Sequence, residues 1–316
     1  MFNRRFLRVK IFQALYAHFQ KDSTEILKSQ NELQLSISRT FDLFLYLLIL
    51  PVELKAQGEK RLEESTKKAM PTSEDLNPNF RFVNNCVIET IANSTRIKKL
   101  TDMNKINWSA QMESVSRFYK FMRESDAYKK YMATAENGLK EDKDMLMALY
   151  RDVLPKFDLF SQTFHEMSIY WDEEDFDYAR YLALQTIKKL GPDLRIDKLI
   201  KDAYENEEDK NFVIKLFNET LKLSDETEQL IMDKAQNWDA DRIALLDMII
   251  MKMAVSEILH FNQIPVKVSM NEYIDISKSF SSPKSGQFIN GIIDKVVQEL
   301  HQQKRFVKVG RGLFEG

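Results

Sequence analysis

The chain has 316 residues, of which 44% are hydrophobic and 30% are charged, a composition typical of a soluble globular protein. Its 46 basic and 48 acidic residues give a net charge of only -2, which by itself argues against a generic nucleic-acid-binding protein. Eight glycines and seven prolines are few for this length, and an all-β protein needs more turns than they allow. The sequence therefore predicts an all-α fold.

Cysteine and histidine usage excludes several kinds of site. Cys86 is the only cysteine, so no internal disulfide can form, and the four histidines are scattered rather than at metal-ligand spacing. We therefore expect a reduced, cytoplasmic protein with no metal and no cofactor. The most apolar run, residues 41–54, is 14 residues long and includes Asp42 and Pro51, whereas a membrane span needs about 20 residues. We interpret this run as a core helix and expect no membrane anchor.

The charges are unevenly distributed along the chain. Four cations, Arg4, Arg5, Arg8 and Lys10, stand close together at the start of the chain, and no acidic residue precedes Asp22. A second basic group follows Glu299: Lys304, Arg305, Lys308 and Arg311. Because the two ends are basic and the middle is acidic, the small net charge is compatible with a nucleic-acid surface confined to the ends.

Hydrophobic periodicity predicts helices throughout the first two thirds of the chain. The clearest break is the stretch MPTSEDLNPN at residues 70–79, whose prolines and capping residues favour a boundary nearby. Acidic residues 172–177 are typical of a helix start, where the helix dipole favours negative charge. The other helices are expected over residues 3–20, 23–57, 80–108, 110–135 and 141–171.

Residues 82–108 align without gaps to residues 212–238, with eight identities in 27 positions. This match indicates an internal duplication, although shared helical amphipathicity would also produce it. Both interpretations stay open.

The last third of the chain carries the clearest helix signals. Asp239 and Asp241 are suited to cap a helix that runs to about residue 261. Ser269 and Glu272 have the spacing of a capping box, which predicts a helix over 270–280.

The final helix is expected over residues 286–301. It contains Gly291, which costs about 1 kcal/mol relative to alanine, and we expect its bare backbone to admit a neighbouring helix. Phe288 follows the polar loop SSPKSG, at a helix N-terminus whose N–H groups favour phosphate. This ring is either a core side chain or a platform on which a base stacks.

On a helical wheel, Arg5 and Tyr16 lie with Phe12 within about 40° of one another, and Arg8 is adjacent. Arginines there would hold phosphates, and Tyr16 would stack on a base or donate a hydrogen bond. A solvated basic face with its aromatic rings packed inward would give the same pattern.

Four segments, in this order, resemble the NusB family of bacterial transcription antitermination factors, in the long form found in Bacteroidetes-type bacteria. They are RRFLRVKIFQALYAHFQ, MKMAVSEIL, IPVKVSMNEYIDISKSF and SGQFINGIIDKV. The last contains the pattern FxNGxxDK, supplied by Phe288, Asn290, Gly291, Asp294 and Lys295.

This resemblance implies a NusB-like helical bundle that binds RNA and has no catalytic activity. It implies a partner, the small-subunit ribosomal protein NusE, with which such proteins bind the boxA element of nascent single-stranded RNA. The pair helps RNA polymerase, within an antitermination complex, to read through terminators, chiefly in ribosomal RNA operons.

The resemblance also implies site residues. The RNA surface would combine the first helix with the start of the last one, so that Arg5, Arg8, Tyr16 and Phe288 share one exposed basic face. The residues it assigns to RNA are Arg4, Arg5, Arg8, Gln13, Tyr16, Lys284, Ser285, Gln287 and Phe288. Asp247 is assigned to the partner surface.

The resemblance covers only part of the chain. Residues 1–38 and 209–301 match the NusB-like core, residues 39–208 form an inserted helical region of unassigned role, and residues 302–316 form a basic tail. Lys284 departs from the family, which commonly has an acidic residue in this loop. A cation there is expected to raise RNA affinity and weaken sequence discrimination.

Two other classes of function, a protein–protein adaptor and an enzyme, are alternatives to RNA binding. A helical protein–protein adaptor with a vestigial RNA surface is the alternative, and the retained arginines and aromatic residues argue against it. An RNA methyltransferase, to which NusB-like domains are sometimes joined, would need a glycine-rich cofactor loop after a strand and a reactive cysteine. Cys86 lies in an apolar helical run, where an inert buried thiol is usual.

Overall fold

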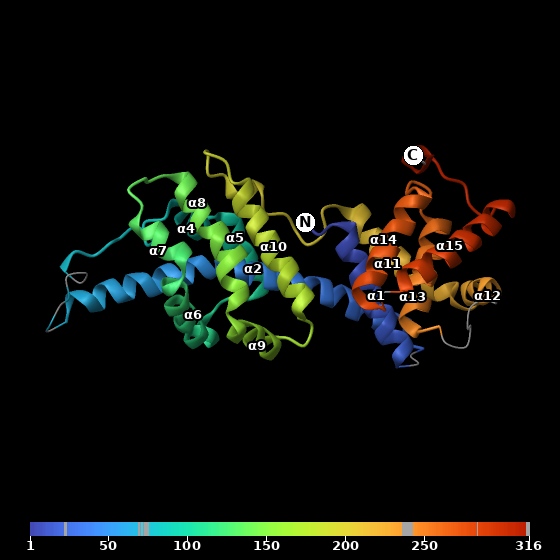
Figure 1. The fold of residues 1–316 in the computed structure, drawn as a ribbon, viewed down its shortest axis with the longest axis horizontal. Coiled ribbons are helices and arrows are strands. Elements are labelled where there is room, and N and C mark those ends of the chain that lie inside the picture. The colour runs from blue at the N-terminus through green and yellow to red at the C-terminus, as the bar shows by residue number, and fades with distance from the viewer. Residues whose placement is uncertain are drawn as a thin grey trace. The chain divides into compact units, whose positions relative to one another are not determined.

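The computed structural model describes residues 1–316 except 22–23, 69, 71, 73–75, 236–242, 283 and 314–316. The described residues form helices, turns and loops but no strand, and the predicted all-α fold is confirmed (Figure 1). The chain divides into two compact units. We call Met1–Ile37 with Tyr204–Gly316 the terminal unit, and Ser38–Ala203 the middle unit.

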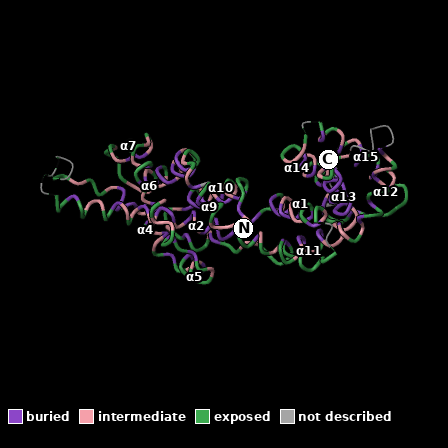
Figure 2. Tube along the Cα trace, turned by 90° about the horizontal axis from the view of Figure 1, so that it is seen from below, coloured by how far each residue is buried: buried purple, intermediate pink, exposed green. Residues whose placement is uncertain are grey.

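The terminal unit is a bundle built around one buried helix, α13. From Asp247 to Ile258 every residue of α13 is buried (Figure 2), and most of these residues are apolar, as expected for a helix that other helices surround. It packs against α1, α11, α12, α14 and α15. The helices of this unit are α1 (Arg4–Gln20), the first turns of α2 (Ile26–Thr66), α11 (Glu207–Lys222), α12 (Ser224–Lys234), α13 (Leu245–His260), α14 (Val266–Phe280) and α15 (Ser285–Gln302), followed by a 3-10 turn (Gly310–Leu313).

Helix α1 begins where the sequence predicts. The side chain of Asn3 accepts a hydrogen bond from the Phe6 N–H at 2.8 Å and so caps the helix. Leu7 and Ile11 are fully buried, on a helix that packs against α11 and α13. The ring of Phe12 lies 5.0 Å from that of Phe280, at the end of α14. Of the two interpretations of this helix, the inward packing of aromatic rings is correct for Phe12.

The predicted capping box before α14 is wrong. The helix begins at Val266, directly after Pro265, because proline is preorganised for a helix start. Ser269 therefore lies inside the helix, and its hydroxyl donates to Glu257 at 2.7 Å. The capping residues predicted before α13, Asp239 and Asp241, lie outside the described residues.

The middle unit contains the rest of α2 and a series of short helices. No unit boundary falls at residues 70–79, contrary to the sequence-based expectation. The helices are α4 (Cys86–Asn93), α5 (Thr95–Asn104), α6 (Met112–Glu124), α7 (Asp126–Ala133), α8 (Leu139–Ala148), α9 (Asp158–Met167) and α10 (Glu173–Lys189). Between them lie 3-10 turns (Ser109–Gln111, Leu154–Lys156 and Ile196–Lys198) and a π turn (Leu149–Val153).

The long helices predicted for this region are divided by serine caps. Ser94 ends α4 and accepts a hydrogen bond from the Ile97 N–H at 3.0 Å, which starts α5. Ser125 does the same between α6 and α7. By contrast, the predicted acidic helix start is confirmed, because Asp172 and Asp175 form a capping box at the start of α10.

Helix α2 contains a proline whose effect is compensated by a tyrosine. Pro51 has no N–H, so the carbonyl of Leu47, four residues earlier, loses its helical partner. The hydroxyl of Tyr150 donates to this carbonyl at 2.9 Å. Tyr150 is fully buried in the π turn, and burial raises the pKa of its hydroxyl, which stays protonated and able to donate. The π turn therefore supports α2 at its proline.

By length and composition alone, α2 could cross a membrane, but 61% of its most apolar window is buried inside the protein. Such burial is typical of a core helix. Trp108 and Trp171 help to fix it, because their indole N–H groups donate to the carbonyls of Tyr46 and Arg39, at 3.1 and 2.6 Å.

Candidate nucleic-acid interface

Arg8 was predicted to be exposed, but it is buried. Only 3% of it is exposed, and its guanidinium forms a two-pronged ion pair with Glu257, with Nε–Oε2 and Nη2–Oε1 distances of 2.8 Å. Burial alone would lower the pKa of Arg8, but the hydrogen bonds to Glu257 raise it above its usual value, so the guanidinium stays charged. Arg8 therefore holds α1 onto α13 and does not face a phosphate.

Glu257 is itself fully buried and fully paired. Besides Arg8, its carboxylate accepts hydrogen bonds from the hydroxyls of Ser269 at 2.7 Å and Tyr273 at 2.8 Å. This cluster was not predicted from the sequence. Its signal was Glu257 in the mostly apolar run MKMAVSEIL, because a carboxylate buried in a core requires partners.

Arg4 is held by the first turn of α11. Its guanidinium lies 2.6 Å from Glu208 and 2.9 Å from Asp209, above the ring of Phe212. One third of its side chain is exposed. Arg4 thus stabilises the packing of α1 on α11. An RNA phosphate would have to compete with these two carboxylates for its guanidinium.

Arg5 and Tyr16 lie on the outer side of α1. The Arg5 side chain is 46% exposed and pairs with Asp275 of α14 at 3.1 Å. Lys278 and Arg5 together lower the pKa of Asp275. Tyr16 is 38% exposed, and Gln13, one turn before it, is half-buried. Together with the exposed third of Arg4, these three residues are the part of the predicted α1 surface that solvent can reach.

The start of α15 supplies the second part of the predicted surface. Lys284 and Gln287 are exposed, and Phe288 is half-buried. Ser285 is buried, however, and its hydroxyl lies 2.9 Å from the hydroxyls of Ser281 and Ser282. Ser285 is therefore positioned to hold the loop rather than to face solvent.

Asp247 is a core residue, not the exposed acidic residue expected on a partner surface. It is only 6% exposed, and its Oδ2 accepts a hydrogen bond from the Ser285 hydroxyl at 2.9 Å. Its other oxygen has no hydrogen-bond partner among the described residues. The hydrogen bond from Ser285 thus ties the start of α13 to the start of α15.

Packing connects the two parts of the surface. Phe12, one turn before Tyr16, packs on Phe280, the last residue of α14, and α15 begins at Ser285. The contacts of Phe12 with Phe280 and of Arg5 with Asp275 therefore attach α1 to the α14–α15 hairpin within the terminal unit.

Gly291 does not admit a neighbouring helix. A Cβ built at this position would meet nothing within 4 Å in the described part of the chain. At Gly286, by contrast, it would contact Ser277 and Ile274 of α14 at 3.5 and 3.8 Å. The close approach of α14 and α15 therefore lies at Gly286, one and a half turns earlier than predicted.

Two cations of the C-terminal basic group are used for internal contacts. Lys308 is 8% exposed, and its ammonium donates to the carbonyls of Ile258 and Phe261, at 2.9 and 3.2 Å, near the end of α13. Arg305 pairs with Glu226 of α12 at 2.6 Å. The bonds from Lys308 satisfy carbonyls that a helix end leaves unpaired. Both cations anchor the tail.

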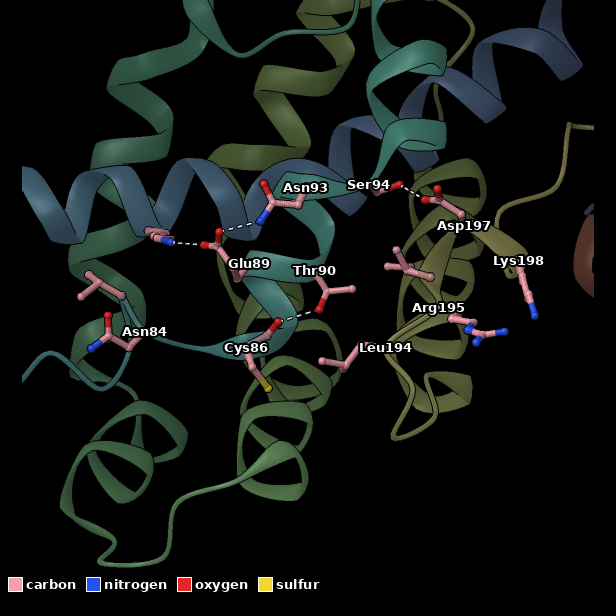
Figure 3. A pocket seen from close by; sticks show the side chains of 13 residues that line it. Asn84, Cys86, Glu89, Thr90, Asn93, Ser94, Leu194, Arg195, Asp197 and Lys198 are labelled. Carbon is pink, nitrogen blue, oxygen red and sulfur yellow. Dashed lines mark hydrogen bonds and ion pairs between the residues drawn. The ribbon is translucent and has the colours of Figure 1, made fainter.

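The middle unit contains a cavity of about 760 Å³ between α4 and residues 194–198 (Figure 3). Its acidic groups are paired, Glu89 with Lys55 at 2.6 Å and Asp197 with the hydroxyls of Ser94 and Thr95. The cavity therefore offers no unpaired acid for chemistry.

Cys86 also lines this cavity. Burial first, and the nearby Asp142 second, raise the pKa of its thiol to about 11. The thiol therefore stays protonated and is a poor nucleophile. Among the described residues, no group of three or more His, Cys, Asp or Glu side chains is arranged to hold a metal.

The fold and surface define the class of the protein: a helical bundle, centred on a buried helix, that presents cations and aromatic rings from its first and last helices. Residues 177–298 match the NusB family model. The transcription antitermination protein NusB of Salinibacter ruber is 45% identical over 104 residues, which are 33% of this chain and 65% of that protein.

Two further proteins of the same name are similar. That of Chloroherpeton thalassium is 33% identical over 126 residues, 38% of this chain and 60% of its own length. That of Koribacter versatilis is 39% identical over 99 residues, 31% of this chain and 68% of its own length. The chain belongs to the NusB family. It covers less than two thirds of the first two relatives, and no solved structure matches it significantly.

Proposed function

We propose that this chain is a cytoplasmic RNA-binding transcription antitermination factor with no catalytic step. The names of its relatives support the process, and the exposed cations and aromatic rings of α1 and α15 support the RNA. The observation that carries the proposal is the packing of Phe12 on Phe280, since it attaches α1, which carries Arg5 and Tyr16, to the hairpin that presents α15.

The proposed RNA surface is smaller than the one expected from the sequence. Arg5 and Lys284 would contact phosphates, and Tyr16 and Phe288 would stack on unpaired bases. Gln13 and Gln287 extend this surface as hydrogen-bonding groups. Arg8 and Ser285, which are buried, and Arg4, which α11 holds, support it from within.

The ligand we propose is a boxA-like single-stranded RNA bound together with the ribosomal protein NusE, as part of an antitermination complex with RNA polymerase at ribosomal RNA operons. Lys284 adds attraction without reading a base, so we expect tight binding with modest discrimination between sequences. Asp247 is excluded from the surface that would meet NusE, because it is buried.

Binding of a boxA-like RNA and of a scrambled RNA of equal length, with and without NusE, tests the proposal. We expect Arg5→Ala and Lys284→Ala each to weaken binding and to lower the salt slope by about 0.7, the value for one phosphate contact on a single strand. Phe288→Ala is expected to cost about 1–3 kcal/mol, as for loss of one stacked base.

A matched control is Arg117→Ala, which removes an exposed arginine that, like Arg5, pairs with one carboxylate. It should leave RNA binding unchanged. If the full chain binds NusE or another protein but neither RNA, the alternative of a helical adaptor with a vestigial RNA surface is correct.

A further inference from the structure

One buried carboxylate joins α13 to α1, which carries part of the proposed RNA surface, and to α14, which packs against α15. Glu257 of α13 accepts two hydrogen bonds from Arg8 of α1, and one each from Ser269 and Tyr273 of α14. All four donor–acceptor distances lie between 2.7 and 2.8 Å, and Glu257 is 0% exposed. Every lone-pair direction of this carboxylate is therefore directed at α1 or α14.

The two-pronged bond fixes how α1 is rotated about its axis. A guanidinium fork meets a carboxylate in one plane, so it sets orientation as well as distance. At 100° per residue, Arg5 and Tyr16 lie about 60° and 80° from Arg8, on the same side of the helix. Holding Arg8 on Glu257 therefore also sets the direction of Arg5 and Tyr16, which are 46% and 38% exposed.

The same carboxylate also binds the helix that receives α1. Tyr273 and Ser269 belong to α14, which also carries Asp275, the partner of Arg5, and Phe280, the partner of Phe12. Helix α14 thus contacts α1 at these two points and is held by Glu257 as well.

Stability alone does not account for this arrangement. Replacing a buried ion pair by apolar residues of similar size is often neutral or stabilising, since both charges lose their hydration. What the pair provides over an apolar contact is a single relative orientation of the helices. We propose that Glu257 is a positioning residue for RNA binding: its carboxylate sets the rotation of α1 and thereby places Arg5 and Tyr16 beside α14 and α15.

This inference rests on the proposed function, and Glu257→Gln in the full-length chain tests it. The substitution keeps the size of the side chain but removes its charge and turns an N–H₂ donor toward the donors of Arg8. We expect the chain to stay folded, by a cooperative thermal melt, and to bind boxA-like RNA about threefold to thirtyfold more weakly, the range for a residue that acts through others.

A double-mutant cycle distinguishes positioning from general weakening. If Glu257 acts through Arg5, then Arg5→Ala should cost less RNA affinity in the Glu257→Gln background than in the wild type. Additive losses would overturn the proposal. Tyr273→Phe, which removes one of the four bonds, provides a milder variant should Glu257→Gln fail to fold, and it should show the same coupling to Arg5.

Arg8→Lys separates positioning from direct contact. Lysine keeps the positive charge but lacks the fork, so the proposal predicts a loss similar to that of Glu257→Gln. A phosphate contact by Arg8 would instead survive as a cation, with affinity and salt slope close to the wild type. That second result would overturn the proposal.

Lys252→Met is the matched control, because it removes another buried charge from the same helix. Lys252 is 4% exposed and pairs with Glu228 at 2.5 Å. RNA affinity should be unchanged, and an equal loss would show that Glu257 acts only through stability. If the wild-type chain binds no RNA, both this inference and the proposed function fail. If it binds and Glu257→Gln binds equally well, only this inference fails.

Discussion

Each unit has a carboxylate that is buried where helices meet. In the terminal unit, Glu257 pairs with a cation, Arg8. Asp142 in the middle unit, 4% exposed, accepts hydrogen bonds from the Tyr131 hydroxyl at 2.6 Å and from the Cys86 N–H at 2.7 Å. Neutral donors are therefore sufficient to join helices, and the arginine of the terminal unit serves a further purpose, which we infer to be orientation.

The largest expected effect is that of removing the cation. Arg8→Ala leaves the Glu257 charge buried without a counterion, and we expect a loss of about 3–5 kcal/mol in the free energy of unfolding. Urea denaturation of the full chain measures this loss. If Arg8→Ala lowered the free energy of unfolding by less than about 1 kcal/mol, Glu257 would need its cation no more than Asp142 does.

The paired replacement Arg8→Met with Glu257→Met should recover most of that stability, since no charge is left buried. We expect the double variant to unfold within about 1–2 kcal/mol of the wild type and still to bind boxA-like RNA more weakly than it. Wild-type RNA affinity in a stable double variant would contradict the orientation role.

In the middle unit the expected effect is smaller. Tyr131→Phe removes one neutral donor from Asp142, and an under-satisfied buried acceptor costs about 1–3 kcal/mol. The same urea titration measures it. RNA binding should not change, because Tyr131 belongs to no part of the proposed surface; a coupled loss of RNA affinity would contradict this separation of roles.

The smallest effect is expected at an exposed carboxylate. Lys278 and Arg5 lower the pKa of Asp275 below the usual value for an aspartate, about 3.9, so its contribution to stability is present above about pH 4 and is lost as pH falls through the lowered value. Exposure keeps this contribution below about 1 kcal/mol. Asp275→Asn should remove that part of the acid dependence of thermal unfolding. It should also release Arg5 and strengthen RNA binding at low salt.

Local sequence signals predicted where several helices begin. The helices α1, α10 and α15 begin within one or two residues of their predicted starts, because Asn3 and Asp172 cap the first two and a polar loop precedes the third. The helices split at Ser94 and Ser125 were predicted as continuous, since amphipathic periodicity continues through a serine that turns out to be a cap.

The candidate site was predicted less well, because the direction of a side chain depends on its partners. Arg8 and Arg5 are equally basic in the sequence, and only the glutamate of a helix some 250 positions later decides which is buried. Asp247 is buried for the same reason, since its carboxylate accepts a hydrogen bond from Ser285, whereas no neighbouring helix in the described part of the chain comes close to Gly291. The family was predicted correctly from four short segments, whereas the long-form assignment and the RNA contacts stay predictions.

The bond from Tyr150 to the carbonyl ahead of Pro51 has a consequence for the order in which the middle unit loses structure. Amide protons around residues 47–51 should be only as protected against exchange with deuterated water as the π turn is against opening. Tyr150→Phe should then raise exchange in both segments together, so that two stretches about a hundred positions apart in the chain form one cooperative unit of unfolding.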